Sequence, residues 1–157
     1  MSVVRKFRPP NRLAKLIKGR GGLMAKDAIA AAEVGVESLR EASLLVLDET
    51  LAEIERRFGS GAPDRESESF EALYGLTLQM IDVSTFVADS GVDQAAISLA
   101  AITDNCAEGG VWRWNAIDVH LNALRLLRTV GAQLPAPDRQ AMLEGLYKVS
   151  HRKVDEL

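Results

Sequence analysis

Apolar residues recur at intervals of three and four along most of the chain, and this spacing predicts helices. The longest such stretch covers residues 24–58, which are rich in the helix-favouring residues Ala, Leu, Glu and Arg. Two apolar stripes follow one another along it: Ile29, Ala32, Val36 and Leu39, then Leu44, Leu47, Leu51, Ile54 and Phe58. Apolar residues at 44–47 occupy nearly every side of the helix, so we expect its middle to be buried on several sides.

A helix over residues 24–58 would be roughly 50 Å long. A compact domain of this size has a diameter of only about 40 Å. The helix must therefore extend beyond the domain, bend near Gly35 or pack against a partner. We predict a homodimer along this helix.

Four further helices are predicted after a loop at residues 59–64. The pattern predicts one over residues 67–88, a short apolar one that starts at a capping Asp93, one over 115–130, and a last one from about 135 to 149. The Asp93 helix is almost wholly apolar through residue 102, and we expect it to be the most buried. Gly75 costs about 1 kcal/mol relative to Ala inside a helix, which suggests that another helix crosses closely there.

No stretch alternates between apolar and polar residues over the length of a strand. The predicted fold is therefore all-α: a helical bundle of four to five main helices, with one long N-terminal helix and a short basic helix before it. The predicted organisation is a basic arm over residues 1–22 and a bundle domain over residues 23–157.

The composition bounds the class of protein. Of the 157 residues, 47% are hydrophobic and 26% are charged, which is ordinary for a folded domain. Cys106 is the only cysteine, so an internal disulfide and a thiolate metal cluster are excluded. No apolar run approaches the roughly 18 residues of a membrane span. We expect a cytoplasmic protein.

The basic arm and the rest of the chain carry net charges of opposite sign. Residues 1–22 carry +7 and the rest of the chain −10, for a net charge of −3. The bases of the arm are candidate partner-binding residues: Arg5, Lys6, Arg8, Arg12, Lys15, Lys18 and Arg20. Between Asn11 and Gly19 they alternate with aliphatic residues, which predicts a short amphipathic helix. This helix could dock on the acidic body, bind a protein partner, or bind nucleic acid or anionic lipid, although the scarcity of aromatic residues disfavours nucleic acid.

Trp112 and Trp114 lie just before the predicted helix 115–130, for which Asn115 is the expected cap. Two interpretations stay open for the tryptophans. They could pack at the start of the helix, or they could form an exposed aromatic hot spot that binds a partner.

His120 falls on the apolar side of the same predicted helix. It could be a hydrogen-bonded core histidine or a phosphoaccepting one, but it lacks the His-x-x-Lys-Gly pattern expected of a phosphotransfer helix. Leu124 stands at i+4, which excludes a helical metal pair. Cys106 has no neighbouring histidine or base in the sequence and is expected to be buried. No catalytic motif is present, and we expect no cofactor and no metal.

Several short motifs resemble a known family. They are Asn11 with the segment 12–17 and Gly21-Gly22, then residues 37–40, 81–83, 112–114, 118–120 and 123–127. Together they are similar to the small CheE-type proteins encoded in chemotaxis operons of alphaproteobacteria. The resemblance implies an accessory protein of chemotaxis signalling that acts through protein contacts, and it implies no catalytic residues.

The predicted function is accordingly a non-enzymatic interaction or regulatory module that binds a signalling partner such as a response-regulator receiver domain. One alternative is a histidine phosphotransfer protein that uses His120. A weaker alternative is nucleic-acid binding through the basic arm.

Overall fold

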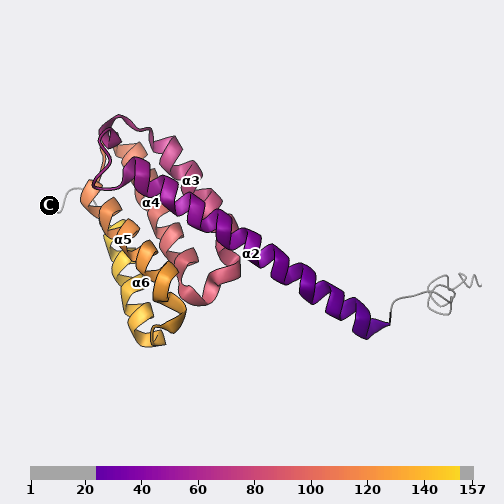
Figure 1. Cartoon of the computed structure of the whole chain (residues 1–157). Coiled ribbons are helices and arrows are strands. Elements are labelled where there is room, and N and C mark those ends of the chain that lie inside the picture. The colour runs from indigo at the N-terminus through magenta and orange to yellow at the C-terminus, as the bar shows by residue number, and fades with distance from the viewer. Residues whose placement is uncertain (1–23, 153–157) are drawn as a thin grey trace, which may run out of the picture. The chain divides into compact units, whose positions relative to one another are not determined.

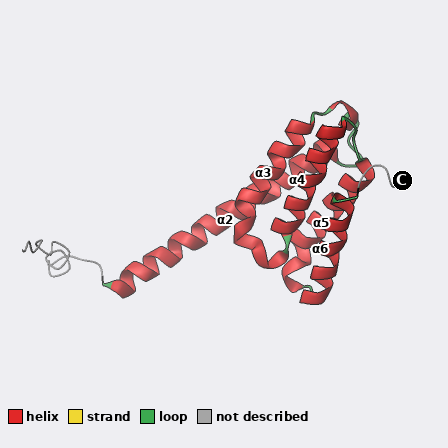
Figure 2. Ribbon diagram, turned by 180° about the vertical axis from the view of Figure 1, so that it is seen from behind, coloured by secondary structure: helices red, strands yellow, loops and turns green. Residues whose placement is uncertain are grey.

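The computed structural model of the chain describes residues 24–152. Over these residues it contains five α-helices joined by turns and short 3₁₀ helices, with no strand (Figure 2). The prediction of an all-α helical bundle is confirmed. The chain divides into two units, Met1–Ser38 and Leu39–Leu157.

The described part of the first unit is the beginning of helix α2 (Ala25–Phe58). Every residue from Met24 to Ser38 is exposed to solvent. The helix is continuous past Gly35, as the sequence predicted for residues 24–58. The basic arm and its predicted short helix lie outside the described residues, and the boundary at residues 22 and 23 stays a prediction.

The second unit contains the rest of α2 and four more helices: α3 (Phe70–Ser84), α4 (Val92–Gly109), α5 (Trp114–Val130) and α6 (Ala136–Ser150). Three 3₁₀ helices connect them: η1 (Arg65–Ser67), η2 (Thr85–Ser90) and η3 (Gly131–Gln133). In Figure 1, α3, α4, α5 and α6 stand side by side, and α4 packs against the other three.

Helix α4 occupies the centre of this unit because small side chains let its neighbours approach it closely. Its buried residues are Val92, Ala95, Ala96, Ser98, Leu99, Ala100, Ile102, Thr103 and Cys106. The prediction that this helix is the most buried one is confirmed. It runs to Gly109, however, and is longer than the sequence indicated.

The second half of α2 joins the core through one face. Leu47, Leu51, Ile54 and Phe58 are buried there. Leu45 remains 61% exposed, so the expectation that the middle of the helix is buried on several sides is wrong. The core lies on one side of α2 only, and two ion pairs at the edge of that face, Asp48–Arg128 and Glu55–Arg125, connect α2 to α5.

Three local predictions about helix starts are also corrected. Helix α3 starts after Ser69, whose hydroxyl accepts a hydrogen bond from the Ala72 amide at 3.2 Å. Helix α4 follows Gly91, whose φ of 82° favours glycine, and Asp93 lies inside the first turn. Helix α5 follows Arg113, so Asn115 is not its cap.

The close helix crossing expected at Gly75 is not observed. Gly75 is exposed, and a Cβ atom built on it would meet nothing within 4 Å. No helix within residues 24–152 has both the length and the apolar content needed to cross a bilayer.

Candidate functional site

The tryptophan junction closes one end of the second unit. The Trp112 and Trp114 rings stack with centroids 4.5 Å apart, and Trp112 also contacts Phe70 at 4.3 Å. Both tryptophans are half-buried. The interpretation that they pack at the start of a helix is therefore confirmed for Trp112 and Trp114, whereas a partner-binding role for them stays a prediction.

Arg65, in the η1 segment between α2 and α3, contacts this junction. Its guanidinium lies 4.5 Å from the centroid of the Trp114 ring, and its Nη1 lies 3.1 Å from a carboxylate oxygen of Asp118. Arginine stacks well on indole and pairs well with carboxylates. Arg65 stands 53 residues before Asp118, so sequence reasoning did not find this contact.

His120 is fully buried between α5 and α4. Its Nδ1 lies 2.8 Å from the carbonyl oxygen of Ala116, and its Nε2 lies 2.8 Å from the Ser98 hydroxyl oxygen. Because a carbonyl only accepts, Nδ1–H is the donor to Ala116, and Nε2 accepts the hydroxyl hydrogen of Ser98. Burial holds the pKa of His120 below its ordinary value, which keeps the ring neutral.

This geometry matches the interpretation of His120 as a satisfied core histidine. A phosphoaccepting histidine has to present a ring nitrogen to the phosphoryl donor, but both nitrogens of His120 are hydrogen-bonded inside the core. The geometry gives the phosphoacceptor hypothesis no support. Sequence reasoning missed Ser98, and its only signal was a polar residue within the apolar face of α4.

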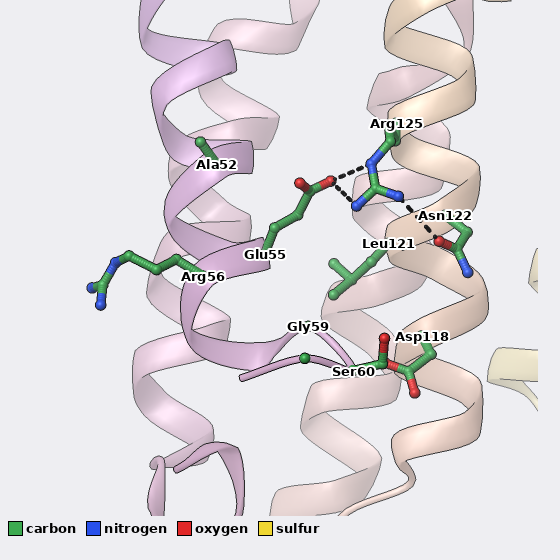
Figure 3. A pocket seen from close by; sticks show the side chains of 10 residues that line it. Ala52, Glu55, Arg56, Gly59, Ser60, Asp118, Leu121, Asn122 and Arg125 are labelled. Carbon is green, nitrogen blue, oxygen red and sulfur yellow. Dashed lines mark hydrogen bonds and ion pairs between the residues drawn. The ribbon is translucent and has the colours of Figure 1, made fainter. Parts of the chain in front are cut away.

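Charged side chains line a cleft between α2 and α5 (Figure 3). Its volume is about 430 Å³, and the Arg125 guanidinium lies 2.8 Å from Glu55 and 3.4 Å from the Asn122 side-chain oxygen. Asp118, at its edge, is paired with Arg65. The charges that face one another in the cleft are therefore already paired. The ion pair between Glu55 and Arg125 links α2 to α5.

A more apolar groove lies between α4 and α6, with a volume of about 510 Å³. Ile97 and Tyr147 form its exposed walls, and the Tyr147 ring stacks on His151 with centroids 3.8 Å apart. Both side chains are more than half exposed to solvent.

Cys106 is buried, and desolvation raises the pKa of its thiol. A thiol with a raised pKa is a poor nucleophile, and this agrees with the predicted packing role. Within residues 24–152, no three His, Cys, Asp or Glu side chains are arranged to hold a metal ion.

The first apolar stripe of α2 is exposed to solvent. Ile29, Val36 and Leu39 are 59%, 57% and 61% exposed, at the same three- and four-residue spacing that the second half of the helix uses for its core. Apolar side chains spaced along one helix face are the usual contact surface between helices.

The bases of the arm, Arg5 to Arg20, lie outside the described residues, and their role stays a prediction. We found no match to the chain among protein-family models, curated proteins or solved structures.

Proposed function

We propose that the chain is a non-enzymatic protein-interaction module and that it serves as an accessory protein in bacterial chemotaxis or two-component signalling. The observation that carries the proposal is the exposed apolar stripe of α2 at Ile29, Val36 and Leu39. Isolated helices are marginal in water and gain most of their stability from packing of the apolar face. A helix that continues for this length with its apolar face in solvent has the properties of a docking element.

The proposed partner is a response-regulator receiver domain in the cytoplasm, and the proposed assembly is a homodimer. The resemblance to CheE-type proteins supports the signalling role. The charge of +7 on residues 1–22 supports the proposal that the partner is acidic. Opposite charges on the two surfaces would accelerate the encounter and make it sensitive to salt.

The direct test is a calorimetric titration of a purified chemotaxis receiver domain with the full chain. We expect saturable binding that weakens about tenfold when Arg12, Lys15 and Lys18 are all changed to Gln, since each lost rim charge contributes to association. Lys148→Gln combined with Arg152→Gln is the control, because these bases are exposed on the body.

Absence of binding to receiver domains in both phosphorylation states would contradict the partner assignment. Equal weakening by the control variant would assign the effect to net charge alone. Burial of the His120 ring and the hydrogen bonds of both its nitrogens argue against phosphotransfer through this residue. Nucleic-acid binding through the arm stays a prediction, because the arm lies outside the described residues.

A further inference from the structure

Residues 25–36 of α2 have a heptad pattern on their exposed side. Ala25, Ile29, Ala32 and Val36 form the seam, and large and small side chains alternate along it. Lys26 and Glu33 lie seven residues apart on one edge of the seam, and Ala28 and Gly35 lie on the other edge. All of these residues are exposed in α2.

We infer that this face binds the same face of a second copy of the chain in an antiparallel helix pair. The inference rests on the proposed interaction role of α2 and names the occupant of its apolar stripe from Ile29 to Val36. In the antiparallel pairing, Val36 packs against Ala25 of the second copy, and Ile29 packs against Ala32. Each layer then combines one large and one small side chain, which is how facing helices fill space without voids.

The edges of the seam match the same pairing. Lys26 of each copy lies opposite Glu33 of the other, so the twofold symmetry creates two ion pairs. Lys26 and Glu33 make no hydrogen bond or ion pair with the other residues described in the structure. On the opposite edge Ala28 faces Gly35, and small residues there allow the two backbones to approach closely.

Other pairings of the two helices satisfy fewer of these groups. An antiparallel pair centred on Glu33 would place Glu33 opposite itself. A parallel pair would place Lys26 and Glu33 opposite uncharged edge residues such as Ala28 and Gly35, and Ala32 opposite Ala32, which leaves a void. A pair shifted toward the second half would need Ser43 and Val46, which are already half-buried within their own chain.

The size of the face sets the strength of the pair. Stable interfaces use about 20–30 residues a side, whereas the seam and its edges lie within 12 residues, 25–36. We therefore expect a weak dimer that forms in the micromolar range and depends on concentration.

The test is sedimentation equilibrium of the full chain over a hundredfold range of concentration, with charge-reversal variants. Lys26→Glu or Glu33→Lys alone should raise the dimer dissociation constant about tenfold, because each change creates two like-charge contacts. The double variant should return it to within about threefold of the original value, since both pairs are restored with reversed polarity.

Asp27→Lys is the matched control. It changes the net charge as much as Glu33→Lys does, but position 27 lies on the helix face away from the seam. Circular dichroism of every variant should show unchanged helix content. Rescue by the double variant with an unaffected Asp27→Lys supports the inference.

A monomer at all concentrations would overturn the inference, and so would a dimer insensitive to the charge reversals or a double variant without rescue. Binding of a receiver domain to Lys26→Glu is measured alongside. If the chain binds the receiver but does not dimerise, this inference and the proposed homodimer fail while the proposed signalling role stands. If the chain dimerises as inferred but binds no receiver, the proposed signalling role fails while this inference stands.

Discussion

The two halves of α2 carry apolar residues at the same spacing but in opposite environments. In the second half, Leu47, Ile54 and Phe58 are buried in the core, whereas in the first half Ile29, Val36 and Leu39 face solvent. Helical periodicity depends only on the requirement for one apolar face. What covers that face depends on tertiary or quaternary packing. The comparison teaches that a predicted stripe identifies a contact surface without identifying its partner.

The strongest way to break this comparison is to truncate the same residue type in both halves. Leu47→Ala should lower the free energy of unfolding by about 2–5 kcal/mol, because it opens a cavity in the core. Leu39→Ala should change it by less than about 0.5 kcal/mol, as expected of an exposed site. Urea denaturation of dilute protein, followed by circular dichroism, measures both. Similar losses in the two variants would show that Leu39 is packed within the monomer.

The next largest effect is expected for the buried hydrogen bond between Ser98 and His120. Ser98→Ala should destabilise the fold by about 1–3 kcal/mol, because Nε2 of the buried His120 loses its partner. Ser150→Ala is a suitable control, since that hydroxyl donates to the Tyr147 carbonyl oxygen at 2.8 Å and its second partner, Nδ1 of His151 at 2.9 Å, belongs to an exposed ring that water can solvate. Equal effects of the two changes would argue against a special Ser98–His120 contact.

Acid should act on the bundle through the same histidine. The pKa of His120 is lowered in the folded state by burial, so the unfolded chain binds a proton first as the pH falls. Stability is therefore unaffected above the unfolded pKa of about 6.5 and decreases below it by up to about 1.4 kcal/mol per pH unit, until the folded pKa is reached.

Denaturation curves between pH 7.5 and 5 check this slope. The change His120→Gln removes the titrating group and should flatten the dependence in that range, even if it lowers stability overall. An unchanged slope in His120→Gln would assign the acid sensitivity to other groups.

The smallest effect is expected in the first half of α2. A Cβ atom at Gly35 would meet nothing within 4 Å, so Gly35→Ala should stabilise this part of the helix by about 0.5–1 kcal/mol. In dilute protein the far-ultraviolet ellipticity should increase, whereas the urea midpoint should not move, because the bundle is unchanged. A shifted midpoint would mean that the two halves unfold together.

The sequence predicted those features that depend on local pattern. The continuous α2, the apolar α4 and the place of His120 on the apolar side of α5 all follow from residue spacing and type. It failed where long-range geometry decides: Leu45 was expected to be buried with the rest of residues 44–47, but it is 61% exposed because the core lies on the other side of α2. Gly75 suggested a crossing helix that is absent, because a glycine can also stand at an open site.

The candidate site was predictable only in part. Trp112, Trp114 and His120 were identified from their sequence positions, but their partners were not, because Phe70, Ser98 and Arg65 come from other elements. Residues 22 positions apart, such as Ser98 and His120, meet only through the packing of α4 on α5. Pairings of this kind depend on how the helices are arranged, and no local pattern encodes them.

Amide hydrogen exchange along α2 tests the central claim most directly, because it follows both halves in one experiment as the protein concentration is raised. Amides of residues 47–58 should be protected at every concentration, since they belong to the cooperative core. Amides of residues 25–36 should exchange rapidly in dilute protein and gain protection as the concentration rises. Rapid exchange of residues 25–36 at all concentrations, or protection that does not depend on concentration, would contradict the account.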